Sequence, residues 1–156
     1  VALLAQDQET VYKNYEEMSL NYATGQIEKF NAADVLVLTM PMWNYSVPAI
    51  MKAWIDQILL PGHTFSISKE DGVQGLHNIK RIVMLVSSGG IYKEDDDRDA
   101  LTRQIRHGFE FIGINEIDVV WAEGQNPLFF DNSEENKAVA MEAATEVAEE
   151  IAEIEL

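Results

Sequence analysis

Two short stretches of the sequence carry residues that could hold a planar ligand with polar edges. Residues 41–45 read PMWNY and place the amide side chain of Asn44 between two aromatic residues. Residues 87–90 read SSGG, and glycines let backbone N–H groups approach a ligand closely. Aromatic walls with a few polar groups suit a ring system better than a phosphate or a metal ion.

Each stretch follows an apolar run that is typical of a buried strand. Residues 35–40, VLVLTM, and 81–87, RIVMLVS, are nearly continuously apolar, which indicates strands covered on both faces. Ligands of open α/β sheets bind at the carboxyl ends of the strands, so we expect the two stretches to meet at one rim. Taken singly, each has a simpler explanation, since a Gly-Gly pair is often a turn and an aromatic residue often only packs.

Helical spacing and turn residues predict the elements between these strands. Residues 48–59 predict a helix that Pro48 opens and Pro61-Gly62 ends, with one apolar stripe made of Ile50, Met51, Trp54, Ile55, Ile58 and Leu59. Residues 63–79 predict a polar excursion with a small hairpin around TFSIS. We also predict a helix at 97–112 with Gly113 as its C-cap, a third strand at 117–121, and a final acidic helix at 133–155 with Ser133 as its N-cap.

The first residues predict one more helix, which we expect Gly25 to break before Ile27 and Phe30; its apolar positions are Val11, Tyr15, Met18 and Tyr22. Strands that alternate with helices indicate an α/β fold with a parallel sheet, in one domain over residues 1–156. Three strands are few for such a sheet, so we expect N-terminal strands to be missing from this chain.

Composition narrows the class of partner. The formal net charge of −16 disfavours nucleic acid and anionic membrane surfaces. Half of it lies in residues 131–156, which indicates a solvated face on the last helix. The sequence has no apolar run long enough to span a membrane and no signal-peptide pattern. It has no cysteine, so we expect a cytoplasmic protein without disulfides. The three histidines show no metal-ligand spacing, which predicts no metal site: His63, His77 and His107.

The stretch PMWNYSVPAIMKAWIDQIL resembles the signature of the flavodoxin-like NAD(P)H:quinone oxidoreductases. TFSISKEDGVQGL, VSSGGIY and FEFIGINEIDVVWAEG follow in the order and spacing of that family. The similarity is greatest to the FMN-dependent NADH azoreductases, historically also labelled acyl carrier protein phosphodiesterases. It implies a flavodoxin-like three-layer αβα fold with a parallel sheet, N-terminally truncated so that three of five strands are present.

The resemblance also implies a cofactor site. FMN, or alternatively FAD, would bind to two loops, whose residues are Pro41, Met42, Trp43, Asn44 and Tyr45 in the first and Ser87, Ser88, Gly89 and Gly90 in the second. NADH or NADPH would reduce the flavin, and a quinone or azo compound would take the electrons in a ping-pong hydride mechanism. No protein nucleophile is required. Tyr92 is a candidate for a proton donor or for a wall of the acceptor pocket.

The family is commonly homodimeric, so a homodimer is expected, with apolar surface from Trp43, Trp54 and residues 63–79. Lys52 and Asp56 are family positions that we expect to pair across one helical turn. The sequence departs from the family in several places. The first strand and its Ser-rich phosphate loop are absent, Ser88 replaces an arginine, and Ser66 or Ile67 stands where an aromatic is usual.

Two other functions fit the same residues. One is a flavin-binding electron carrier or regulatory subunit without NAD(P)H turnover, and the other is an interaction protein whose site has decayed. Without the missing strands, residues 35–40 would form an open apolar edge. We therefore expect this chain alone to bind FMN weakly and to self-associate, unless it is part of a larger polypeptide.

Overall fold

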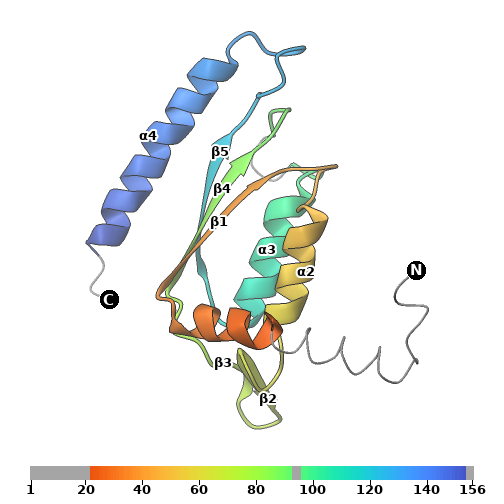
Figure 1. Cartoon of the computed structure of the whole chain (residues 1–156), viewed down its shortest axis with the longest axis vertical. Helices are drawn as coiled ribbons and strands as arrows, with labels where there is room; N and C mark the ends of the chain where they lie inside the picture. The colour runs from red at the N-terminus through yellow and green to blue at the C-terminus, as the bar shows by residue number, and fades with distance from the viewer. Residues whose placement is uncertain (1–21, 93–95, 154–156) are drawn as a thin grey trace, which may run out of the picture.

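A computed structural model describes residues 22–92 and 96–153 of the chain. Three parallel strands form the main sheet in the order β1 (Val35–Pro41), β4 (Arg81–Ser87) and β5 (Glu116–Ala122). Helices α2 (Ala49–Ile58) and α3 (Ala100–Phe111) cover one face, and α4 (Ser133–Ala152) lies on the other face beside β5 (Figure 1). The predicted α/β architecture with three parallel strands is confirmed.

The core lies between the sheet and the two helices α2 and α3. Ile82, Met84 and Val86 of the central strand are buried, as expected for a parallel strand. Ile55 and Ile58 of α2 and three residues of α3 pack in the same cluster, the latter being Leu101, Ile105 and Phe109. The helical stripe predicted over residues 97–112 is therefore confirmed. This packing fixes the strand ends that carry the two loops.

A small hairpin lies at the amino end of the sheet, below α2 and α3 (Figure 1). It consists of β2 (Phe65–Ser68) and β3 (Gly72–Gly75), which confirms the hairpin predicted around TFSIS. The buried hydroxyl of Thr64 donates to the Ile58 carbonyl at 2.6 Å and so joins the hairpin to the end of α2. The hairpin exposes the side chain of Ile67, and Leu76 just beyond it is also exposed.

Two predictions about helices are wrong. Gly25 does not break its helix, whose described part covers residues 22–32. A helical glycine costs about 1 kcal/mol, whereas burying Ile27 and Phe30 contributes about 1.5–3 kcal/mol each. Ile50 is 81% exposed. The packed stripe of α2 consists of Met51, Ile55 and Ile58, and the side chain of Ile50 lies about 100° away from this stripe around the helix. Val11, Tyr15 and Met18 lie outside the described residues.

The helix ends differ from prediction by a few residues. Asn132, not Ser133, is the N-cap of α4, and its side chain makes no capping hydrogen bond. Helix α3 begins at Ala100, where the Asp99 carboxylate accepts from the Thr102 N–H at 3.0 Å. Gly113 directly follows the C-cap Ile112 with φ of +95°, the left-handed conformation expected of a glycine at a helix end.

Several further expectations can be compared with the described residues. Strand β1 has β4 as its single neighbour among the described strands and forms an edge of the sheet. The Lys52 ammonium and the Asp56 carboxylate pair at 2.5 Å, as predicted. Trp54 is partly buried against the core, so it offers less surface than expected. Within residues 22–92 and 96–153 there is no helix with the length and apolarity of a membrane span, and no cluster of three metal-ligating side chains.

Candidate functional site

The strand register brings three loops to one rim of the sheet. Pro41 of β1 is level with Ser87 of β4, which is level with Ala122 of β5. Each of these residues is the last of its strand, so the loops that follow begin side by side. The Met42 N–H donates to the Ser87 carbonyl at 2.7 Å and joins the first two loops directly. The two predicted stretches therefore meet at the carboxyl edge, as expected.

The first loop is a tight turn with an uncommon backbone. Trp43 and Ser46 exchange two backbone hydrogen bonds of 3.1 and 3.0 Å, and Asn44 and Tyr45 between them have φ of +50° and +66°. Two positive φ values define a turn of type I′, in which Asn is favoured at the first position and Gly at the second. Tyrosine at the second position stores strain of about 1–3 kcal/mol, and such strain is concentrated at functional sites.

Helix α3 holds this turn in place. The N–H of Ala100, the first residue of α3, donates to the Tyr45 carbonyl at 3.0 Å. The Ser46 hydroxyl contacts the Gln104 side-chain oxygen at 3.3 Å, one turn further along the helix. A strained turn persists only when its surroundings fix it, and these two contacts supply that support.

The second loop is held through its carbonyl groups. The Ser88 carbonyl accepts from the Gln125 N–H at 2.9 Å, and the Gly89 carbonyl from the Asn126 N–H at 3.4 Å. The Gly90 carbonyl accepts from the Gly124 N–H at 2.9 Å and from the Ser88 hydroxyl at 2.9 Å. Ser88 is buried, and its hydroxyl is engaged within the loop. All three acceptors of the loop are therefore used inside the protein.

Four backbone amide donors of the two loops remain available for a ligand. Among the described residues, the N–H groups of Asn44, Tyr45, Gly89 and Gly90 donate no hydrogen bond. The Asn44 side chain is exposed and is likewise without a partner there. Backbone donors that lack a protein acceptor must bind water or a ligand. Two loops that present such donors at one rim form a binding edge.

A cavity of about 520 Å³ lies beside these donors. Aromatic side chains and the backbone of two glycines contribute to its lining. The lining residues are Tyr45, Gly89, Gly90, Ile91, Tyr92, Arg98, Asn126, Phe129 and Phe130. A Cβ atom on Gly90 would come within 3.3 Å of the Tyr92 hydroxyl, so a larger residue there would fill the cavity. Of the predicted residues, Tyr45, Gly89, Gly90 and Tyr92 line this cavity.

Tyr92 occupies the centre of an aromatic group. Its ring lies 6.3 Å from that of Tyr45, edge to face, and 6.1 Å from that of Trp121. Burial raises the pKa of the Tyr92 phenol, and the neighbouring Tyr45 raises it further, while the charge of Arg98 acts in the opposite direction. The phenol therefore keeps its proton at neutral pH and can donate a hydrogen bond.

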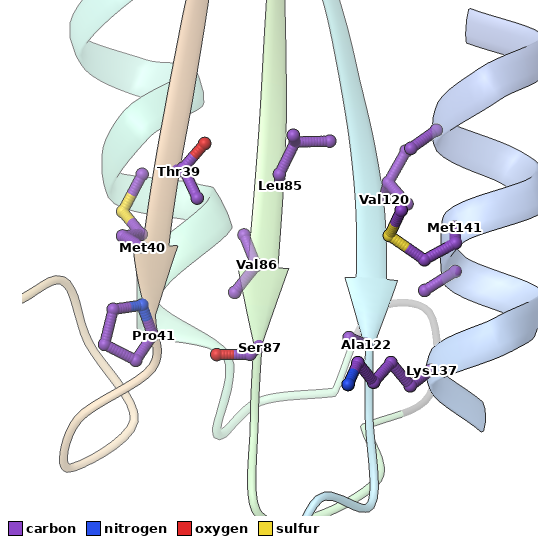
Figure 2. Close-up of a pocket in the computed structure, with 12 residues that line it drawn as sticks. Thr39, Met40, Pro41, Leu85, Val86, Ser87, Val120, Ala122, Lys137 and Met141 are labelled. Atoms are coloured by element: carbon purple, nitrogen blue, oxygen red, sulfur yellow. The ribbon is translucent and has the colours of Figure 1, made fainter. Parts of the chain in front are cut away.

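Two further cavities lie away from the unpaired amides. An apolar groove of about 360 Å³ separates α4 from the sheet and is lined by Thr39, Leu85, Val120, Met141 and others (Figure 2). Pro41 and Ser87 border this groove rather than the rim cavity. A polar cavity of about 600 Å³ lies on the other side of Tyr92, between α3 and β5, where Arg106 donates to the Ile117 carbonyl at 2.9 Å. The groove has no aromatic side chain in its lining, and the polar cavity is lined by none of the residues whose unpaired amides belong to the two loops.

The sequence analysis missed the contribution of the loop between β5 and α4. Asn126, Phe129 and Phe130 line the cavity, and Phe129 and Leu128 are 76% and 85% exposed. This loop lies between the strand predicted at 117–121 and the helix predicted at 133–155, and it follows the third strand just as the two predicted stretches follow theirs. Its place after a neighbouring parallel strand was the signal that could have assigned it to the same rim.

Comparison with known proteins gives consistent relatives. Residues 2–150 match the protein family described as having a flavodoxin-like fold. An FMN-dependent NADH:quinone oxidoreductase of Gluconobacter oxydans (strain 621H) is 38% identical over 101 residues, which are 63% of this chain and 50% of that protein. The protein of the same description from Stenotrophomonas maltophilia (strain K279a) is 41% identical over 100 residues, 63% of this chain and 49% of its own. The chain thus spans about half the length of the curated relatives it matches.

Solved structures give the same result for the fold. The azoreductase AzrA superposes with a TM-score of 0.75 at 30% identity, over 85% of this chain and 64% of its own. An FMN-dependent NADH-azoreductase from Bacillus anthracis str. Ames Ancestor, solved in complex with FMN, gives a TM-score of 0.72 at 27% identity, over 86% and 65%. With the matched residues, the parallel sheet and its layers of helices in agreement, this chain belongs to the family of proteins with a flavodoxin-like fold.

Proposed function

We propose that the protein containing this chain is an FMN-dependent oxidoreductase that transfers electrons from NADH or NADPH to quinones or azo compounds. The observation that carries the proposal is the joint presentation of unpaired amides by two loops at one rim, beside a cavity with aromatic walls. Relatives and structural neighbours that bear these activities in their names support the same conclusion.

The residues present fit a flavin ring. An isoalloxazine ring is planar, and most of the polar atoms along its pyrimidine edge are carbonyl oxygens and ring nitrogens that accept hydrogen bonds. The N–H groups of Asn44, Tyr45, Gly89 and Gly90, together with the Asn44 side chain, are unpaired donors among the described residues. The glycines have no Cβ atom that would obstruct the approach of a ring. We therefore assign FMN binding to Met42–Tyr45 and Ser87–Gly90, with Pro41 leading into the first loop.

When bound, FMN would supply the hydride chemistry, so that NAD(P)H and one proton convert a quinone to its hydroquinone. Fixed amide dipoles stabilise negative charge at low cost because they need no reorganisation during the reaction. The N–H groups of Gly89 and Gly90 therefore favour the reduced, more negative form of a ring at this edge. Trp43 and Tyr45, 60% and 51% exposed, provide flat surfaces beside it.

We assign Tyr92 to the acceptor side of the cavity. Its phenol is held next to the Gly90 backbone, and burial keeps it neutral. A neutral phenol can donate a hydrogen bond to an acceptor oxygen or supply a proton to it. Tyr92→Phe should lower kcat for a quinone and leave FMN affinity within about fivefold of wild type, because one neutral hydrogen bond is worth only about 1 kcal/mol.

We also propose a homodimer located in the cytoplasm, with residues 1–156 in a single domain. Exposed apolar side chains support an interface, since a monomer would leave Trp43, Ile67, Leu76 and Phe111 in contact with water. The absence of cysteine suits a reducing compartment. The family match over residues 2–150 supports one domain. Sedimentation of the full-length protein at micromolar concentration tests the dimer.

The proposed function can be tested on the full-length protein by FMN titration and by steady-state oxidation of NADH with a quinone. Two variants probe the site. Asn44→Gly removes the side-chain amide but tolerates the φ of +50°, and Gly89→Val places bulk at the ring edge. The matched controls are Asn115→Gly, on the surface at the far end of the sheet, and Gly25→Val, with open space around its Cβ position.

Both site variants should weaken FMN binding by about tenfold or more, which corresponds to 1.4 kcal/mol, and both controls should bind as wild type does. An FMN affinity within about threefold of wild type in the double variant, Asn44→Gly with Gly89→Val, would disprove the assignment. Flavin binding without NADH turnover would indicate an electron carrier or regulatory subunit instead. A wild-type protein that binds no flavin would indicate an interaction protein with a decayed site.

A further inference from the structure

We propose that Glu123, Gly124 and Asn136 form a latch that aims the Gly89 and Gly90 N–H groups at the ligand, with Glu123 as a positioning residue. The inference rests on the proposed function for the identity of the ligand. It concerns residues outside both predicted loops, on the segment between β5 and α4. The latch is defined here as these three residues with Gln125 and Asn126, together with the hydrogen bonds that all five make.

The first support is the orientation of the peptide groups. In a trans peptide, the carbonyl of one residue and the N–H of the next point in opposite directions. The Ser88 carbonyl accepts from Gln125, so the Gly89 N–H points away from the β5–α4 loop. The Gly89 carbonyl accepts from Asn126, so the Gly90 N–H points away as well. The hydrogen bonds that the Ser88 and Gly89 carbonyls accept from the β5–α4 loop therefore orient the Gly89 and Gly90 N–H groups away from that loop.

The second support is the Glu123 side chain. Its carboxylate oxygen accepts the Tyr92 N–H at 2.6 Å, just beyond the second loop. The same residue holds the other end through its backbone, because its carbonyl accepts from the Asn136 side chain at 3.2 Å and from the Gln125 side chain at 3.0 Å. Glu123 thus links the second loop to helix α4. No other described carboxylate contacts residues 87–92 by a hydrogen bond.

The third support is the backbone of Gly124, which donates to the Gly90 carbonyl at 2.9 Å. Its φ is +62°, and an added Cβ would come within 2.8 Å of the Asn136 amide nitrogen, 3.3 Å of Phe130 and 3.4 Å of Ile91. Only glycine combines this backbone with so close an approach of α4. Gln125 closes the arrangement by donating from its side chain to the Ser133 carbonyl at 3.0 Å, on the first turn of α4.

The test compares three substitutions in the full-length protein. Glu123→Gln keeps an oxygen acceptor for the Tyr92 N–H and removes the charge, whereas Glu123→Leu removes both. Asn136→Ala releases the latch from the α4 side and serves if Glu123→Leu does not fold. Glu116→Leu, at the exposed amino end of β5, is the matched control. The first readout is amide hydrogen exchange, without flavin, of Gly124, Gln125 and Asn126, whose N–H groups donate to the carbonyls of the second loop. The second readout is FMN binding with the reduction potential of the bound flavin.

We expect faster exchange at these amides in Glu123→Leu and Asn136→Ala, with FMN affinity lowered about tenfold, the change that 1.4 kcal/mol produces. The FMN affinities of Glu123→Gln and Glu116→Leu should stay within about threefold of the wild-type affinity. Since outward amides favour reduced flavin, the potential in Glu123→Leu should be more negative than in Glu123→Gln. Charge loss alone would affect both substitutions equally.

Unchanged exchange in both Glu123→Leu and Asn136→Ala would overturn the latch, whatever the protein binds. Faster exchange with unchanged FMN affinity and potential would overturn the positioning role, because the loop would then not aim donors at the ligand. A wild-type protein that binds no FMN would refute the proposed function separately, and the exchange data from the ligand-free protein would still report on the latch.

Discussion

The guanidinium of Arg98 lies over the ring of Tyr92, with its Cζ atom 5.2 Å from the ring centroid. A cation over an aromatic face is held by the negative charge density of the ring. The same guanidinium binds the Asp96 carboxylate at 2.7 Å. Tyr92 therefore borders the candidate cavity with its position and its ionisation coupled to a charged pair on the surface.

Replacing Arg98 should raise the pKa of Tyr92 further above its ordinary value of about 10, because the Arg98 charge is an influence that lowers it against the effect of burial. A tyrosine whose pKa is higher in the folded than in the unfolded protein contributes to stability at pH values below its unfolded-state pKa. That contribution is lost as the pH rises through its folded-state pKa. The measurement is the ultraviolet absorbance of tyrosinate during alkaline titration of Arg98→Met, with Tyr92→Phe identifying the signal. Arg103→Met is the control, and a Tyr92 transition at lower pH in Arg98→Met would contradict the prediction.

Asp96 should make stability depend on acid pH. Hydrogen bonds from the Arg98 side chain and backbone lower the pKa of Asp96 from 3.8 to about 2. A carboxylate whose pKa is lower in the folded than in the unfolded protein stabilises the fold at pH values above its unfolded-state pKa. This contribution disappears as the pH falls through its folded-state pKa. Wild type should therefore be more stable than Asp96→Asn at pH above about 4, with the difference vanishing towards pH 2. Thermal unfolding of both proteins at several pH values measures it, and a constant difference would refute the prediction.

The strained turn predicts an inverted order of stability at Tyr45. Tyr45→Gly and Tyr45→Ala both remove the aromatic ring. They differ only in the Cβ atom, and therefore in how easily the backbone adopts a positive φ. At a φ of +66° alanine bears the left-handed penalty of about 1–2 kcal/mol, which glycine avoids. Tyr45→Gly should therefore be more stable than Tyr45→Ala by about 1 kcal/mol in urea unfolding. In ordinary strand or helix positions the order is the reverse, so a more stable alanine variant would mean that the turn is relaxed.

A double-mutant cycle can test the close approach at Gly124. Gly124→Ala should destabilise by at least about 1–2 kcal/mol, from the left-handed backbone alone, plus the cost of the 2.8 Å contact with Asn136. In an Asn136→Ala background that contact is gone, so the same substitution should cost less, by about 0.5–1 kcal/mol. Gly89→Ala, which meets Asn126 at an ordinary 3.4 Å, is the control for adding a methyl group. Strict additivity would show that Asn136 does not restrict this glycine.

The buried strands were predictable because apolar runs leave little choice. Strands β1, β4 and β5 match the expected ranges to within a residue or two, since a strand covered on both faces needs continuous apolar residues. Local rules failed where tertiary packing outweighed them. Gly25 stays helical because Ile27 and Phe30 are buried nearby, and Ile50 is exposed because one residue of rotation places it off the packed stripe.

The site was predictable in part for a similar reason. Loops after parallel strands share a rim, so Met42–Tyr45 and Ser87–Gly90 were bound to meet once the strands were known. The direction of the peptide groups was not predictable, since it depends on hydrogen bonds from Gly124, Gln125 and Asn126 that no spacing encodes. The positive φ of Tyr45 was equally hidden, because tyrosine rarely adopts it.

Helix α4 has twenty residues but buries only one of them, Ala140. It is held at one end by Arg81, whose guanidinium binds Asp118 of β5 and the Glu150 carboxylate at 2.7 Å. Its other end is held by the polar contacts of Ser133 and Asn136. Residues 131–156 carry nine acidic side chains and one lysine, a net charge of −8, and the rest of the chain carries the other −8 of the total of −16, so repulsion between the two parts is relieved when the helix leaves the surface.

A segment with so few buried contacts opens at a lower free energy than the core does. We therefore expect helix α4 to be its own cooperative unit, which detaches in sub-global openings while β4 and α3 stay folded. Because charge repulsion drives this opening, added salt should protect the helix more than it protects the core. We thus expect two regions with different free energies of opening. One is the parallel sheet with two helices, which unfolds as a whole, and the other is the acidic helix, whose attachment to the sheet depends on the ionic strength.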